Sequence, residues 1–180
     1  MKREIYQHID IVEGVEAELD GNILKIKGKE GEQTKNFKMK DIEFRKEGNK
    51  IVIGSKKATK KEKKVINAVS SHIRNMMKGA LEKFEYDLKI CSSHFPMSVE
   101  VKEGGVTVKN FLGEKTPRYV KMPLGVEIKV DKDLIKVLSV DKELAGQVAA
   151  KLETLTKIRN RDRRVFQDGI FITSKSGREI

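Results

Sequence analysis

KIRNRDRRVFQDGIFITSK, residues 157–175, joins a dense run of positive charge to the pattern of a buried strand. Five of its first eight residues are Lys or Arg, and Asp162 is the only acid among them. Phe166, the turn pair Asp168-Gly169 and the apolar residues 170–172 follow. Cations near a helix C-terminus would account for one or two of these residues, but not for five. Because guanidinium groups suit phosphate oxygens, the stretch predicts a rigid cationic turn that contacts a polyanion.

The elements around this stretch occur twice along the chain. When residue n is set beside residue n+84, short patterns of the first half return in the same order in the second half. The closing strands of the two halves correspond at a shift of 82, residues 84–90 to residues 166–172. A repeated order of elements indicates a duplicated domain. The matched segments are Val15-Glu16 with Val99-Glu100, Gly21 with Gly105, residues 42–45 with residues 126–129, and Ile51 and Ser55 with Ile135 and Ser139.

Each half combines strand patterns with one helix pattern. Residues 15–29 alternate around an Asp-Gly-Asn turn, which predicts a hairpin. Thr59 and Glu62 have the spacing of a capping box, and apolar residues recur at helical spacing over residues 66–81. A second helix is predicted from about residue 141 to residue 155.

These patterns predict an α+β fold of two tandem duplicated domains, each a small, mainly antiparallel β-sheet with one helix packed on a face. The expected domains are residues 1–91 and 92–180, because CSSHFP at residues 91–96 breaks the periodicity. The second domain has an additional hairpin-like loop at residues 109–121, which contains further Lys and Arg side chains. An ordinary solvated loop explains these residues equally well.

The positive charge of the chain is concentrated in two short patches. The net charge of the 180 residues is +11, and 36% of them are charged. Residues 1–55 are balanced, with 11 basic and 11 acidic side chains, whereas residues 56–64 hold six Lys against Glu62 and residues 157–164 hold five cations against Asp162. This distribution is typical of a polyanion footprint, although residues 56–64 are nearly as well explained by a solvated Lys-rich loop.

Cysteine usage and hydropathy indicate a soluble, cytosolic protein. The single cysteine, Cys91, cannot form an internal disulfide and suits a reducing compartment. The N-terminal residues lack the apolar core of a signal peptide, and no apolar run approaches the length of a membrane span.

No motif of the sequence predicts catalysis. Cys91 and His94 lack the further ligands that a structural zinc site needs. Ser92, Ser93 and His94 are adjacent in sequence and are not accompanied by a nucleophile elbow. The chain also lacks a Gly-Lys-Ser/Thr phosphate loop. We therefore expect no enzyme activity, no metal and no cofactor.

The closing stretch resembles a known family. Its pattern is Arg161-x-x-Arg164-x-Phe166-x-Asp168-Gly169-Ile170-Phe171-Ile172-x-x-Lys175. This pattern is similar to the C-terminal signature of the ribosomal protein L-six family of the large ribosomal subunit. Residues 160–169 and the loop NFLGEK at residues 110–115 resemble the archaeal and eukaryotic branch, and the bacterial ending Tyr-Lys-Gly-Lys-Gly is absent.

The resemblance implies a non-catalytic, cytoplasmic protein of the large ribosomal subunit. It implies binding to large-subunit ribosomal RNA near the sarcin–ricin loop and the base of the factor-binding stalk, mainly through residues 92–180. Neighbouring ribosomal proteins and translation factors are the other expected partners, with no membrane and no small-molecule substrate. The residues expected to bind RNA are Lys109, Lys115, Arg118, Lys157, Arg159, Asn160, Arg161, Arg163, Arg164, Lys175 and Arg178, and those expected to set the turn are Phe166, Asp168 and Gly169.

Two other functions are alternatives on the sequence. One is an RNA-binding module outside the ribosome; the aromatic content of 6% speaks against a single-strand binder with base-stacking platforms. The other is a metal-dependent RNA-processing enzyme that uses Cys91, His94 and nearby acids, which metal analysis of the purified protein would test.

Overall fold

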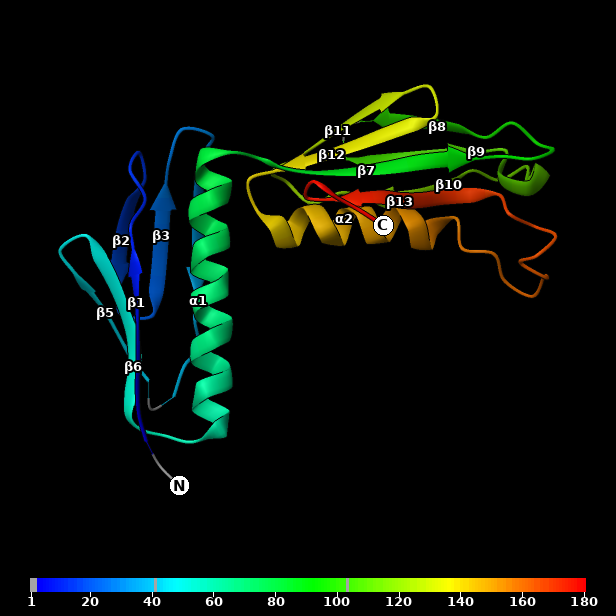
Figure 1. The fold of residues 1–180 in the computed structure, drawn as a ribbon. Helices are drawn as coiled ribbons and strands as arrows, with labels where there is room; N and C mark the ends of the chain where they lie inside the picture. Colours follow the sequence, from blue (N-terminus) through cyan, green and yellow to red (C-terminus); the bar gives the residue numbers. More distant parts are fainter. Residues whose placement is uncertain (1–2, 41, 103) are drawn as a thin grey trace. The chain divides into compact units, whose positions relative to one another are not determined.

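The computed structural model describes residues 3–40, 42–102 and 104–180 and divides the chain into two compact units, residues 1–83 and 84–180. Each unit contains antiparallel sheets and one long helix, so the expected α+β fold of two tandem domains is confirmed (Figure 1). None of the helices in the described part of the chain is long and apolar enough to cross a membrane.

The first unit contains two three-stranded antiparallel sheets and helix α1. One sheet has the order β1-β6-β5 and the other the order β2-β3-β4. The hairpin expected over residues 15–29 is formed by β2 and β3. The elements are β1 (Arg3–Asp10), β2 (Glu16–Asp20), β3 (Ile23–Lys27), β4 (Glu32–Asn36), β5 (Glu43–Glu47), β6 (Lys50–Ala58) and α1 (Lys60–Leu81).

Helix α1 begins where the sequence predicts. The Thr59 side chain accepts a hydrogen bond from the Lys61 amide, and the Glu62 carboxylate accepts one from the Thr59 amide at 2.7 Å, which completes a capping box. The apolar face of the helix packs on the sheets in one core, in which Ile66 and Ile73 are fully buried.

The second unit contains a five-stranded sheet, a three-stranded sheet and helix α2. The five strands have the order β11-β12-β7-β13-β14, and the three have the order β10-β9-β8. The elements are β7 (Phe84–Cys91), β8 (Ser98–Lys102), β9 (Gly105–Lys109), the 3₁₀ turn η1 (Phe111–Gly113), β10 (Arg118–Lys121), β11 (Val126–Asp131), β12 (Leu134–Ser139), α2 (Lys142–Leu155), β13 (Gly169–Lys175) and β14 (Arg178–Glu179).

The core of the second unit follows from the alternation of its strands. Leu88 of β7, Val137 of β12 and Ile170 of β13 are fully buried and pack in one cluster with Leu152 of α2. Lys89 and Phe171, on the alternate positions, are exposed. Asp141 caps the N-terminus of helix α2, and its side chain accepts a hydrogen bond from the Glu143 amide at 2.8 Å.

The structure divides the chain after Lys83 rather than after Cys91 as we expected. Strand β7 was expected to close the first domain, but it pairs with β12 and β13 inside the sheet of the second unit. Alternation identifies residues 84–91 as a strand but does not identify its partners, which explains the displaced boundary.

The duplication relates β1, β5, β6 and α1 to β7, β11, β12 and α2. In each unit the first of these strands pairs with the last strand before the helix. The expected correspondence of residues 84–90 with residues 166–172 is therefore corrected. The first segment lies in β7 and the second contains the start of β13; these two strands pair with each other, and β13 has no counterpart among the described strands of the first unit. The hairpin-like loop expected at residues 109–121 comprises η1 and strand β10, which pairs with β9.

Candidate nucleic-acid interface

The cationic stretch forms an exposed loop between α2 and β13, which we call the arginine loop, residues 157–168 (Figure 1, orange). Its backbone turns at Asn160, which has a left-handed conformation with φ of 56°. The structure brings six of the predicted RNA-binding residues together here, and all six are exposed: Lys157, Arg159, Asn160, Arg161, Arg163 and Arg164.

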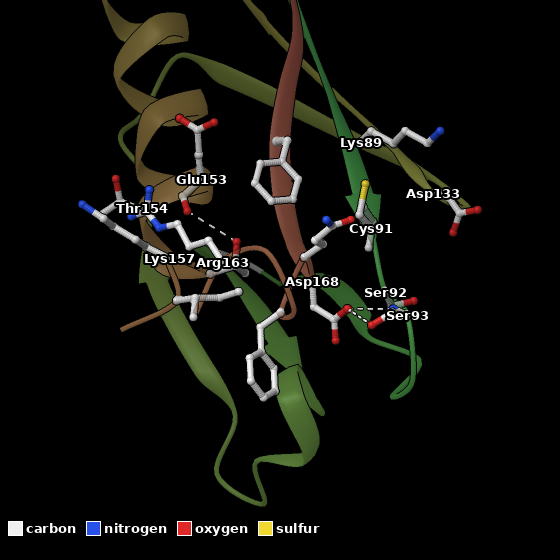
Figure 2. Close-up of a pocket in the computed structure, with 16 residues that line it drawn as sticks. Lys89, Cys91, Ser92, Ser93, Asp133, Glu153, Thr154, Lys157, Arg163 and Asp168 are labelled. Atoms are coloured by element: carbon white, nitrogen blue, oxygen red, sulfur yellow. Dashed lines mark hydrogen bonds between the residues drawn. The ribbon is translucent and has the colours of Figure 1, made fainter. Parts of the chain in front are cut away.

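Two buried side chains fix the ends of the arginine loop. The Thr156 hydroxyl accepts a hydrogen bond from the Ile170 amide at 2.8 Å, which closes the loop at its base. The Asp168 carboxylate accepts hydrogen bonds from the amide and the hydroxyl of Ser93, at 2.7 and 2.6 Å (Figure 2). Asp168 is 4% exposed, so its carboxylate fastens the β7–β8 connection to the start of β13 in addition to forming a turn.

Asp162 organises the interior of the loop. Its carboxylate accepts a hydrogen bond from the Arg164 amide at 2.9 Å, and its carbonyl accepts one from the Phe166 amide at 3.0 Å. The Arg164 guanidinium also donates to this carboxylate, at 2.8 Å, and these bonds hold the pKa of Asp162 below its ordinary value. Because the pair is solvent-exposed, it stabilises the fold little and leaves Arg164 able to exchange its partner for a phosphate.

Phe166 and Gly169 lie where the arginine loop leads into β13. The Arg161 guanidinium lies over the Phe166 ring, 4.9 Å from its centroid, which limits the positions this charge can take. Gly169 has φ of +156°, and a Cβ there would lie 3.1 Å from the Phe171 ring. A larger residue at Gly169 would therefore displace that ring.

Arg118 is engaged within the protein. Its guanidinium donates two hydrogen bonds to Glu114, at 2.8 and 2.6 Å, and one to the Leu155 carbonyl at 2.7 Å, and it lies over the Phe111 ring, 4.3 Å from its centroid. This Arg118 hydrogen bonding, aided by the positive charge of Arg161, lowers the pKa of Glu114. Arg118 was expected to bind RNA. In the structure its guanidinium is hydrogen-bonded to Leu155, the last residue of α2, shortly before the arginine loop begins.

The other predicted cations are divided between two places. Lys109, at the end of β9, forms an ion pair with Glu100, and Lys115 is exposed in the turn before β10. Lys175 and Arg178 pair in the β13–β14 hairpin. Strand β13 advances about 3.3 Å per residue, so these last two cations lie roughly 20 Å from the loop end of the strand. The structure does not bring them together with the arginine loop.

A hollow of about 910 Å³ lies beside the arginine loop (Figure 2). Lys157 and Arg163 of the loop line it, together with Lys89 and Phe171, which sequence reasoning missed. Lys89 and Phe171 are cross-strand neighbours on the exposed face of the sheet. The alternation of β7 could have identified Lys89, whereas the position of Phe171 beside it depends on the β7–β13 pairing.

The Lys-rich run of the first unit spans the end of β6 and the first turn of α1. Its six lysines are exposed and form no ion pair with the described residues. Among the described residues, no three His, Cys, Asp or Glu side chains lie where they could hold a metal ion.

The duplicated α+β fold and the exposed arginine loop define the chain as a basic protein of two α+β domains. The family model described as "Ribosomal protein L6" matches residues 11–83 and 95–169, and the chain belongs to this family. The family is one of structural ribosomal components rather than enzymes, as the resemblance implied. The first matched segment lies within the first structural unit, and the second matched segment lies within the second unit.

The chain is similar over nearly its whole length to archaeal proteins named "Large ribosomal subunit protein uL6". It is 37% identical over 175 residues to that of Methanothrix thermoacetophila, with 97% of this chain and 99% of the relative covered. It is 39% identical to that of Methanobrevibacter smithii, with 95% and 96% covered, and 42% identical to that of Staphylothermus marinus, with 93% of each covered. The expected archaeal resemblance is confirmed.

Proposed function

We propose that this chain is a structural constituent of the large ribosomal subunit in the cytoplasm and binds large-subunit ribosomal RNA through the arginine loop. The observation that carries the proposal is the bracing of that loop by Thr156 and Asp168, since a fixed turn presents its cations with little loss of conformational freedom on binding. Family membership and the printed names of the relatives support the ribosomal setting.

The RNA contacts should be mainly to the backbone. Arg and Lys dominate the loop, and folded RNA is recognised largely by shape, phosphates and 2′-hydroxyls. We propose that this surface lies near the sarcin–ricin loop and the base of the factor-binding stalk, as the family resemblance implies. Neighbouring ribosomal proteins, and translation factors that pass this region, are the proposed protein partners.

Sedimentation of a native lysate at low and high salt tests the proposal. The protein should migrate with the large subunit at low salt and stay there well into higher salt. A purified sample should bind large-subunit ribosomal RNA with an affinity that falls steeply with salt, because each neutralised phosphate releases counterions. Migration with free proteins at both salts would refute the ribosomal assignment and favour an RNA-binding module outside the ribosome.

A further inference from the structure

We propose that the hollow beside the arginine loop holds one unpaired RNA nucleotide, with its base against the Phe171 ring and its amino group on the Asp168 carboxylate. The inference rests on the proposed RNA binding and specifies what this site takes besides backbone phosphates. A volume of about 910 Å³ accommodates a nucleotide (Figure 2).

Phe171 supplies the stacking surface. Its side chain is 42% exposed, although it lies on a strand inside a five-stranded sheet. The ring rests on Gly169, where a Cβ would come within 3.1 Å of it. The glycine backbone thus supports the ring, and the exposed part is available to a base. Stacking of this kind accepts every base, because each has a π face.

Asp168 supplies a polar group that selects among bases. It is 4% exposed, and its Oδ1 accepts both hydrogen bonds from Ser93. No hydrogen bond from the described residues reaches Oδ2. Oδ2 is therefore available as an acceptor to a ligand in the hollow, and the exocyclic amine of cytosine or adenine would donate to it.

The cations around the hollow suit a phosphate. Lys89, Lys157 and Arg163 line it, are exposed, and form no ion pair with the described residues. Asp133, Glu153 and Asp168 line the hollow as well, so an apolar partner would bury charges of both signs. A nucleotide supplies an aromatic face, an amine and an anion together.

Cys91 allows a direct test, because it is the only cysteine of the chain and lines the hollow. The rate at which a maleimide alkylates it reports whether the hollow is occupied. Single-stranded oligocytidylate and oligoadenylate should slow alkylation several-fold. An abasic oligomer of equal length, which keeps the phosphates, should bind the arginine loop without slowing it.

Two variants and one control sharpen the test. Phe171→Ala should abolish the protection and weaken oligocytidylate binding about tenfold. If it fails to fold, Phe171→Leu keeps apolar packing without an aromatic face. Asp168→Asn keeps an acceptor for Ser93 but offers an amide donor, so protection should shift towards oligouridylate. Phe95→Ala removes a ring of nearly the same exposure, 41%, outside the hollow and should change neither protection nor affinity.

The outcomes separate this inference from the proposed function. Equal protection by the abasic oligomer would show a phosphate contact only, and unchanged alkylation with every oligomer would show an empty hollow. Either result overturns the nucleotide site while salt-sensitive binding to large-subunit ribosomal RNA persists. Loss of that binding would instead refute the proposed function.

Discussion

Asp168 and Ser93 are 75 positions apart in the chain and are joined twice: Asp168 Oδ1 accepts hydrogen bonds from the Ser93 amide at 2.7 Å and from its hydroxyl at 2.6 Å. The contact fastens the segment after β7 to the residue before β13. Strands β7 and β13 are adjacent in the five-stranded sheet. The arginine loop is therefore anchored to the sheet as well as to the end of α2.

Asp168→Ala should destabilise the second unit by about 1–3 kcal/mol, because it removes a buried, charged acceptor of two hydrogen bonds from Ser93. Urea unfolding monitored by circular dichroism measures the loss. Ser93→Ala removes only the hydroxyl bond and should cost less. Equal stability of Asp168→Ala and the wild type would show that water replaces the carboxylate without cost.

Thr156→Val should loosen the base of the arginine loop. Valine has the shape of threonine but cannot accept the hydrogen bond from the Ile170 amide, and Thr156 is only 3% exposed. We expect a loss of about 1–3 kcal/mol and faster hydrogen exchange at the Ile170 amide. Exchange at Leu88, in the neighbouring strand, serves as the control, and unchanged exchange at Ile170 would contradict the assigned role.

Glu114 and Arg118 should make stability depend on pH in the acid range. Hydrogen bonding to Arg118 lowers the folded-state pKa of Glu114 below its ordinary 4.5, so the contribution is present above that pH and is lost as pH falls through the lowered value. The difference in free energy of unfolding between the wild type and Glu114→Gln should therefore be largest near neutral pH and shrink in acid.

The background Arg118→Ala provides the control for that pH dependence. Without the guanidinium, Glu114→Gln should have almost no further effect at any pH, since the two residues act as one unit. A pH-dependent difference that persists in Arg118→Ala would assign the lowered pKa of Glu114 to another group.

Arg161→Ala combined with Arg164→Ala should weaken binding to large-subunit ribosomal RNA and reduce the slope of log affinity against log salt by about two. Both side chains are exposed, so the melting curve should stay close to that of the wild type. Filter binding over a salt series measures both effects. An unchanged affinity at moderate salt would remove these arginines from the interface.

Lys175→Ala with Arg178→Ala is the matched comparison, because it removes two cations from the other end of β13. Any loss it causes should add to that of the loop pair in free energy, since the two sites are roughly 20 Å apart. Strong non-additivity would mean that one stretch of RNA contacts both ends of the strand.

Local patterns predicted the elements of this fold well. Thr59 and Glu62 identify the start of α1 because a capping box is built from neighbouring residues, and the Asp-Gly-Asn turn identifies the β2–β3 hairpin for the same reason. Strand pairing was less predictable. Residues 84–91 alternate as any half-buried strand does, and nothing within them indicates that β12 and β13 are their neighbours.

The candidate site shows the same limit. The arginine loop could be predicted because its charges lie within eight consecutive residues of the sequence. The engagement of Arg118 could not, because its acceptor on Leu155 is a backbone carbonyl 37 positions away. The hollow depends on Lys89 and Phe171, which become neighbours only through strand register.

The two copies of the domain differ at one edge, and that difference affects self-association. In the second unit β13 covers β7, whereas no described strand covers the matching edge of β1 in the first unit. Unpaired strand edges template cross-molecule ladders and, eventually, amyloid. Arg3, Glu4 and Asp10 are exposed along β1, and charges of this kind act as gatekeepers. Replacing these charged residues with apolar ones would leave the open edge of β1 free to pair with another molecule, and the protein would then tend to aggregate.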